Sequence, residues 1–252
     1  MDNLNLQAHR GVCIEYPENT MSAFVGAIMQ GYKVIELDPA VTKDGVFVCM
    51  HDKTINRTGR NIDGSIIEKD KCISDITFEE VDMYDYGIWF SNKFKGERIP
   101  KLTDVLDLAV KHNVLVKLDN KYRNFTDENI ERLFALLAPY INNVAFTCYD
   151  IDMVLRVISK FTDANIHYDG LVNDDILDKL SKIVKDDKLT VWVPFECSLT
   201  SWVKVEFADE KLCKKIKKYA KLGVWILSEY EDLEVARSWG ADFVETNGKL
   251  KP

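Results

Sequence analysis

The chain has 252 residues, of which 46% are hydrophobic, and a formal net charge of −8. This size allows one large α/β barrel as well as two small domains. The acidic balance argues against a nucleic-acid binder, whose affinity depends on basic residues that neutralise phosphates. It leaves room for a small anionic substrate, because a metal and a few cations can reverse the potential locally.

Neither a membrane span nor a secretory signal is expected. No segment approaches the roughly 20 consecutive apolar residues of a membrane-spanning helix, and the first residues, MDNLNLQAHRG, lack the basic and apolar regions of a signal peptide. The cysteines stand at positions 13, 49, 72, 148, 197 and 213. They show no CxxC motif, and most lie in apolar runs, so we expect buried thiols in a soluble, cytoplasmic protein.

Short apolar runs alternate with longer amphipathic segments along the chain. The runs predict nine strands, at residues 4–9, 33–38, 46–51, 114–119, 143–148, 164–169, 189–195, 223–227 and 241–246. Apolar residues at helical spacing predict seven helices, at residues 20–30, 103–112, 127–138, 151–161, 174–185, 210–222 and 231–239. This alternation indicates parallel strands joined by helices, and about eight such units indicate a TIM-type (β/α)8 barrel.

Nine strands are one too many for this barrel, and the sequence leaves open which one lies outside it. The connection at 39–45, PAVTKDG, is too short for a helix and is either irregular or a local hairpin with a turn at Asp44-Gly45. The polar, aromatic-rich residues from roughly 53 to 100 also break the alternation. We expect a single catalytic barrel domain over residues 1–252. Its small insertion at 53–100 follows the strand that ends in His51 and lies over the C-terminal face, where barrel enzymes build their sites.

Polar residues close several of the predicted strands. They are His9-Arg10, Glu36, Asp38, His51-Asp52, Asp119 and Lys121. In a barrel these strand ends converge on one face. Because side chains alternate along a strand, Glu36 and Asp38 point to the same side, and so do Asp119 and Lys121.

This set of residue types points to phosphate chemistry. Three carboxylates are unfavourable side by side unless a cation binds them, and a set of oxygen ligands suits Mg²⁺, Ca²⁺ or Mn²⁺. His9 and His51 could supply a general acid and a general base near neutral pH. Arg10 and Lys121 would hold an anionic group. Together the residues indicate phosphoryl transfer or cleavage of a phosphodiester.

Each of these residues also has a purely structural interpretation. Glu36, for example, could form a surface ion pair with Lys33 or Lys43. The two other histidines, His112 and His167, have no comparable acidic neighbours at a strand end and are interpreted as ordinary residues.

Two further carboxylates are predicted to support the site. We expect Asp52 to orient His51 or to accept backbone N–H groups, rather than to take part in catalysis. We expect Glu18 to orient Arg10 or to cap locally, rather than to bind metal.

The motifs HRG, PENT, ELD, TKDG, HD and NRT follow one another between His9 and Thr58, and IPKLTDVL, LDNK, GVWIL and GADFVET follow them toward the C-terminus. In this order and spacing the motifs resemble those of the glycerophosphodiester phosphodiesterase family. The resemblance implies a TIM-type barrel that hydrolyses glycerophosphodiesters to glycerol 3-phosphate and an alcohol. It assigns one divalent metal to Glu36, Asp38 and Asp119, and the acid–base roles to His9 and His51.

The sequence departs from the family pattern at three places. The family usually has Glu at the position of Asp119, a Trp-Thr pair where this chain has Trp225-Ile226, and a Thr-Asp-x-Pro pattern where residues 246–248 read Thr-Asn-Gly. Trp225 is still expected to line the substrate pocket. The head group of the substrate, the metal, the nucleophile and the oligomeric state are not specified by the sequence.

Two alternative functions are compatible with the sequence. One is a phospholipase C- or D-like enzyme that acts on lipid head groups, with YGIWF at residues 86–90 and Trp202 as candidate membrane-facing residues. The other is a non-catalytic sensor that binds a phosphodiester. Paired histidines argue against the sensor, because binding alone does not need a proton donor and a proton acceptor.

Overall fold

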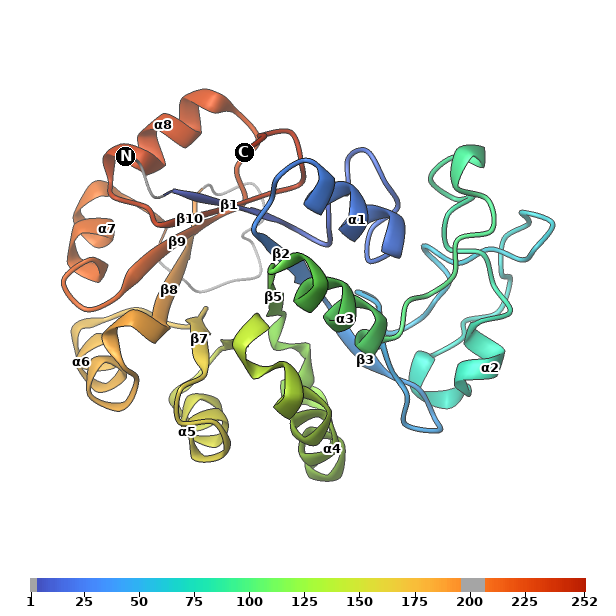
Figure 1. Ribbon diagram of the computed structural model, residues 1–252, viewed down its shortest axis with the longest axis horizontal. Helices are drawn as coiled ribbons and strands as arrows, with labels where there is room; N and C mark the ends of the chain where they lie inside the picture. The colour runs from blue at the N-terminus through green and yellow to red at the C-terminus, as the bar shows by residue number, and fades with distance from the viewer. Residues whose placement is uncertain (1–3, 196–206) are drawn as a thin grey trace.

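The computed structural model describes residues 4–195 and 207–252, so Cys197 and Trp202 lie outside the described residues. Eight strands pair in parallel and close into a barrel that is surrounded by helices (Figure 1). Their order around the barrel is β1 (Asn5–Ala8), β10 (Phe243–Thr246), β9 (Lys221–Trp225), β8 (Leu189–Pro194), β7 (Asn165–Tyr168), β6 (Val144–Cys148), β5 (Leu115–Leu118) and β2 (Val34–Leu37). The predicted TIM-type architecture is confirmed.

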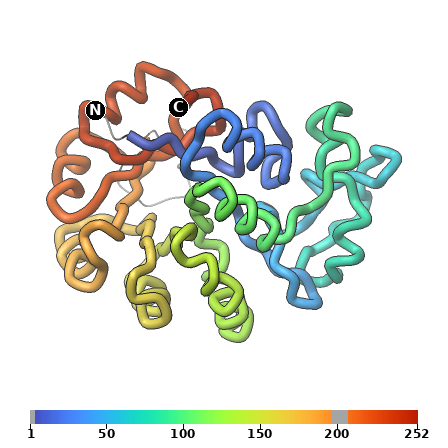
Figure 2. Tube along the Cα trace, in the orientation of Figure 1, coloured from blue at the N-terminus to red at the C-terminus, as the bar shows by residue number. Residues whose placement is uncertain are grey.

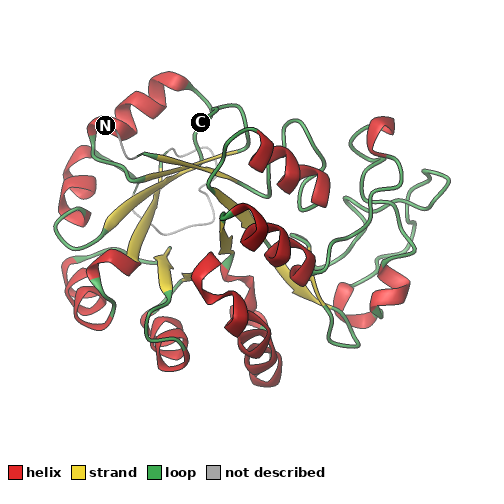
Figure 3. Ribbon diagram, in the orientation of Figure 1, coloured by secondary structure: helices red, strands yellow, loops and turns green. Residues whose placement is uncertain are grey.

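Helices connect successive barrel strands and form the outer layer (Figure 3). They are α1 (Met21–Met29), α3 (Leu102–His112), α4 (Asp127–Leu137), α5 (Ile151–Lys160), α6 (Asp174–Ile183), α7 (Glu210–Ile216) and α8 (Tyr230–Ser238). Short 3-10 helices lie at Ile73–Asp75, Asn92–Phe94, Asn120–Asn124, Ala138–Asn143 and Asp186–Lys188. The helix predicted at 210–222 is too long, because β9 already begins at Lys221.

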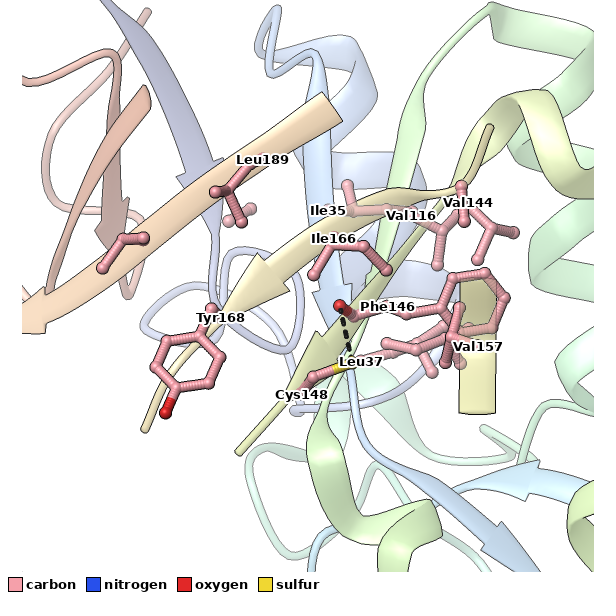
Figure 4. Close-up of a cluster of buried hydrophobic side chains, with 14 of the residues drawn as sticks. Ile35, Leu37, Val116, Val144, Phe146, Cys148, Val157, Ile166, Tyr168 and Leu189 are labelled. Atoms are coloured by element: carbon pink, nitrogen blue, oxygen red, sulfur yellow. Dashed lines mark hydrogen bonds between the residues drawn. The ribbon is translucent and has the colours of Figure 1, made fainter. Parts of the chain in front are cut away.

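Apolar side chains of the strands pack between the barrel and the helices. Figure 4 shows Ile35, Val116 and Phe146 from three neighbouring strands in one cluster with Val157 of α5. The ring of Phe146 contacts the ring of Phe134 on α4 edge-on, with centroids 5.9 Å apart. This layer is the main hydrophobic core of the molecule.

Many of the alternate strand positions are polar and meet inside the barrel. Lys117 of β5 contacts Glu245 of β10, and His167 of β7 contacts the ring of Phe243 on β10. These strands are not neighbours, so the contacts cross the barrel interior. Burial, followed by the charge of Lys117, lowers the pKa of His167 well below its usual value, which makes His167 a neutral core histidine.

The surplus predicted strand is the one at 46–51. It forms β4 (Phe47–Cys49), which pairs antiparallel with β3 (Pro39–Val41) in a hairpin outside the barrel. The turn closes with a hydrogen bond from Thr42 N to Val46 O, and Gly45 adopts a φ of 78° that favours glycine. The hairpin alternative is therefore correct, but β4 ends at Cys49, and His51 follows the strand rather than ending it.

The segment after β4 lies to one side of the barrel, beyond α1 and α3 (Figure 2). It contains α2 (Phe78–Val81) and shares a small hydrophobic cluster with the hairpin, which includes Val48, Ile55 and Tyr86. Trp89 and Phe90 of the YGIWF stretch pack edge-on against each other within this segment. The single-domain organisation over residues 1–252 stays a prediction.

The described residues can be compared with the expectations for membrane-spanning helices and for cysteines. None of the described helices is long and apolar enough to cross a membrane. The described cysteines, at positions 13, 49, 72, 148 and 213, are free thiols.

Candidate active site

Glu36, Asp38 and Asp119 converge at the C-terminal ends of β2 and β5. These strands are neighbours, and Leu37 pairs with Leu118, so Asp38 and Asp119 follow directly after paired residues. Each side chain offers an oxygen that lies within 4.8 Å of the oxygens offered by the other two. Glu36 is only 3% exposed, which contradicts the interpretation of this residue as part of a surface ion pair.

The cluster carries unfavourable electrostatic energy that a bound cation would relieve. Burial raises the pKa of Glu36 well above its usual value, and the neighbouring Asp38, Glu245 and Asp119 raise it further. The pKa of Asp119 is raised for the same reasons, by burial and then by Asp38. Because all donors in the cluster are oxygen atoms, the cluster fits a hard divalent cation and could hold one.

The loop after β1 locks Arg10 and Asn19 against this cluster. The backbone N–H of Arg10 donates to Glu36 Oε2 at 2.8 Å, and Arg10 Nε lies 3.2 Å from Asp38 Oδ2. Asn19 donates to Asp38 Oδ2 at 2.7 Å and accepts from the backbone N–H of Asp38 at 3.2 Å. Arg10 and Asn19 both have positive φ, of 56° and 55°, a strained conformation that often marks functional sites. Thr20 is the residue that caps α1.

The β3–β4 hairpin brings His51 to the same rim. The backbone N–H of Met50 donates to Asp38 O at 2.8 Å, and this hydrogen bond connects the residues that follow β4 to the end of β2. His51 Nδ1 lies 2.6 Å from Asp52 Oδ1, so Asp52 makes the contact expected of an orienting residue. Arg57 Nε in turn donates to Asp52 Oδ2 at 2.6 Å.

Arg57 joins this group to the Arg10 group through Glu18. Both Arg57 Nη atoms donate to the Glu18 carboxylate, at 2.8 and 2.7 Å, and Glu18 also accepts from Arg10 Nη1 at 3.0 Å. Burial opposes ionisation of Asp52, but the hydrogen bonds from Arg57 and His51 outweigh it and lower the pKa of Asp52 to about 2. A chain of ion pairs therefore runs from His51 to Arg10.

His9 lies in a more enclosed place, with its side chain 17% exposed. Its Nδ1 is 2.7 Å from Asn247 Oδ1, and its Nε2 is 3.9 Å from Glu245 Oε1. Burial lowers the pKa of His9, but a hydrogen bond with Cys13 and the charge of Glu245 outweigh it, so the pKa is raised overall. Asn247 thus holds one ring nitrogen of His9, and the other faces Glu245.

Lys121 and Trp225 occupy different parts of the barrel mouth. Lys121 Nζ lies 3.5 Å from Asp38 Oδ1, and the backbone N–H of Lys121 donates to Asp119 Oδ1 at 3.0 Å. Lys121 therefore contacts two of the three clustered carboxylates. Trp225 is half-buried and donates from Nε1 to Asp169 Oδ1 at 3.1 Å. The functional roles predicted for these and the other site residues stay predictions.

Several residues of the site were not singled out by the sequence patterns. Arg57 and Asn19 belong to the NRT and PENT motifs, which gave a signal for their importance but not for their contacts. Asn247 lies within a stretch that departs from the family pattern. Asp169 directly follows β7 as Asp38 directly follows β2, and this common position is the signal that could have found Asp169. Glu245 lies within β10, where the sequence pattern gives no such signal.

Asp169 allows a prediction about stability and pH. Burial, reinforced by Glu245 and opposed by Lys117, raises the pKa of Asp169 to about 6. An unfolded aspartate titrates near 3.9, so the folded chain binds the extra proton between about pH 4 and pH 6 and loses stability as the pH rises. Asp169→Asn removes this effect. The free energy of unfolding of the variant, relative to that of wild type, should therefore increase by about 1–3 kcal/mol when the pH is raised from 4 to 7.5.

The measurement is urea unfolding of both proteins at the two pH values in EDTA. Asp175→Asn, at an exposed position on α6, is the matched control and should show no such difference. An equal stability difference between Asp169→Asn and wild type at both pH values would contradict the assignment.

The sequence of the chain is similar to sequences of known proteins. Residues 9–246 match the sequence model of the Glycerophosphoryl diester phosphodiesterase family. The glycerophosphodiester phosphodiesterase of Caldanaerobacter subterraneus subsp. tengcongensis is 43% identical over 114 residues, which cover 45% of this chain and 44% of that protein. Glycerophosphodiester phosphodiesterase 1 of Mus musculus is 37% identical over 145 residues, which cover 56% of this chain and 41% of that protein. The matched residues thus span less than half of either relative's length.

Solved structures share the fold at low sequence identity. An Oleispira antarctica phosphodiesterase in complex with the product sn-glycerol-3-phosphate superposes with a TM-score of 0.76, at 18% identity, over 97% of this chain and 93% of that chain. The glycerophosphodiester phosphodiesterase of Thermotoga maritima gives a TM-score of 0.70, at 20% identity, over 98% and 95%. At these identities the likeness establishes the barrel fold.

Proposed function

The chain belongs to the glycerophosphoryl diester phosphodiesterase family, and we propose that it hydrolyses glycerophosphodiesters to glycerol 3-phosphate and a free alcohol. The observation that carries this proposal is the meeting of three carboxylates, two cations and two oriented histidines at one end of the barrel. The names of the relatives and the product bound to the Oleispira antarctica phosphodiesterase support the same substrate class.

Glu36, Asp38 and Asp119 would hold the divalent metal, for which we propose Mg²⁺ or Ca²⁺, with Mn²⁺ also suitable. When bound, such an ion supplies Lewis-acid neutralisation of charge on a phosphodiester oxygen. Asp119 is one methylene shorter than the glutamate usual in the family, which leaves more space on that side of the cluster.

Arg10 and Lys121 flank Asp38 and are placed to bind the non-bridging oxygens of an anionic phosphodiester. Arg10 offers a planar fork whose orientation is fixed by Glu18. Trp225, held by Asp169, would contact the rest of the substrate at the barrel mouth.

His9 and His51 would perform the two proton transfers. One histidine takes the proton of the nucleophile, which is either water or a neighbouring hydroxyl of the substrate, and the other donates a proton to the oxygen of the leaving alcohol. Each ring has Nδ1 fixed by an acceptor, Asn247 for His9 and Asp52 for His51, which leaves both Nε2 atoms for proton exchange. A sensor would not need two such rings.

We also propose a partner and a cellular location for this chain. A small-molecule phosphodiester is the proposed partner, and the acidic net charge argues against nucleic acid. Free thiols among the described cysteines agree with the reducing cytoplasm as the proposed location.

The test compares water-soluble and lipid substrates. Glycerophosphocholine and glycerophosphoethanolamine are incubated with the protein and Mg²⁺, Ca²⁺, Mn²⁺ or EDTA, beside phosphatidylcholine vesicles under the same conditions. We expect metal-dependent release of glycerol 3-phosphate from the soluble diesters, no release in EDTA and no turnover of vesicles. Turnover of the vesicles alone would favour the phospholipase alternative, and tight binding without turnover of any substrate would favour the sensor.

A further inference from the structure

A buried ion pair between Lys117 and Glu245 lies next to His9 in the barrel interior. Lys117 Nζ contacts Glu245 Oε2 at 3.1 Å, and the two side chains are only 5% and 6% exposed. Lys117 Nζ also lies 3.9 Å from the centroid of the Trp192 ring, and Gln7 Nε2 donates to Glu245 Oε2. Neither charge is one of the proposed metal ligands or substrate contacts.

The two oxygens of Glu245 have different surroundings. Lys117 and Gln7 both contact Oε2. The other oxygen, Oε1, faces His9 Nε2 at 3.9 Å, while Asn247 holds His9 Nδ1. A carboxylate buried inside a barrel stays charged only when it is paired, and Lys117 provides that partner. The pKa of Glu245 is accordingly lowered: burial opposes ionisation, but the charges of Lys117 and His9 outweigh it.

We propose that Glu245, kept ionised by Lys117, is a positioning residue for His9 that orients the imidazole and stabilises its protonated form. The proposal rests on the proposed function, in which His9 transfers a proton. It adds a pair of barrel-interior residues, from β5 and β10, that act through the histidine and do not touch the substrate.

The other groups around His9 do not replace Glu245. Arg10, on the same loop, opposes protonation of His9. Cys13 and Asn247 favour protonation of His9 through hydrogen bonds, the Cys13 bond more strongly than the charge of Glu245, but Glu245 is the carboxylate that adds a charge to this environment. Glu36 is engaged by the backbone N–H of Arg10, and Asp169 by Trp225. Glu245 is therefore the carboxylate that faces the free nitrogen of His9.

The test is the titration of His9 by NMR on the full chain in EDTA, with the His9 signal assigned by its loss in His9→Ala. In wild type the pKa of His9 should lie above 6.5, the ordinary value. Glu245→Gln keeps the shape and removes the charge, so the His9 pKa should fall by about 1 unit. Glu229→Gln, which removes a carboxylate that is about half exposed and paired with Lys249, is the matched control and should leave it unchanged.

Glu245→Gln leaves Lys117 buried without its partner and could fail to fold. The double variant Lys117→Met/Glu245→Gln removes both charges of the pair, so that neither partner is left alone, and should show the same fall. One limb of the kcat/KM profile with the activating metal should move to lower pH by the same amount, the acidic limb where His9 is the base and the basic limb where it is the acid.

An unchanged His9 pKa in the folded variants, or a wild-type value at or below 6.5, would overturn the positioning role. That result in an active enzyme overturns this inference alone. Absence of hydrolysis in wild type overturns the proposed function instead, and the NMR titration is read independently of it.

Discussion

Replacing His51 or His9 by alanine is expected to lower kcat for glycerophosphocholine by about 10²–10⁴-fold, the range lost when a general acid or base is removed. Both rings are held by an acceptor at Nδ1. In the proposed mechanism each ring makes one proton transfer that water performs poorly. The measurement is steady-state release of glycerol 3-phosphate at saturating metal.

The matched control is His112→Ala, because His112 is exposed on α3, away from the barrel mouth, and should turn over like wild type. Binding of the metal should persist in the His9 and His51 variants, since neither side chain belongs to the carboxylate cluster. Turnover near the wild-type rate in either variant would remove that histidine from the proton transfers.

Replacing Asp119 by alanine is expected to weaken the apparent metal affinity by at least about 10–100-fold, the loss produced when even an outer-shell partner of a metal is removed. Asp119 supplies one of the three clustered carboxylates, and its raised pKa reflects the burial and repulsion that a cation would relieve. The measurement is metal titration by calorimetry, together with metal-dependent activity.

The affinity for the metal should also decrease as the pH is lowered. The pKa values of Glu36 and Asp119 are raised, so protons compete with the metal at both carboxylates. Asp119→Glu, which restores the residue usual in the family, should keep binding, and Asp175→Ala, at an exposed position, should match wild type. Unchanged metal titration in Asp119→Ala would remove Asp119 from the proposed ligands.

The sequence predicts the barrel and its acidic rim because both follow from local periodicity. Alternation along a strand puts Glu36 and Asp38 on one side, and the barrel brings their strand beside the one that ends in Asp119. Those three carboxylates do converge. Periodicity could not show which of nine strands lies outside the barrel, because β4 belongs to a short apolar run like those of the barrel strands and only its pairing with β3 distinguishes it.

The barrel interior explains what the sequence could not predict. Lys117 and Glu245 lie at alternate polar positions of strands, where the pattern is the same for a side chain in solvent as for one inside a closed barrel. Only closure brings β5 and β10 across from each other. The ion pairs of Arg57 likewise depend on the fold of the segment beside the barrel, which has no periodicity from which to infer them.

The most direct test of the central claim is ³¹P NMR of glycerophosphocholine during turnover with the activating metal. The structure and the family predict that glycerol 3-phosphate is the final phosphorus product, and that the substrate signal persists unchanged in EDTA or with His51→Ala. Phosphocholine as the product would show that the bond to glycerol is cleaved instead of the bond to choline. That result, or equal turnover in EDTA, would contradict the proposal that the metal cluster and the two histidines release glycerol 3-phosphate.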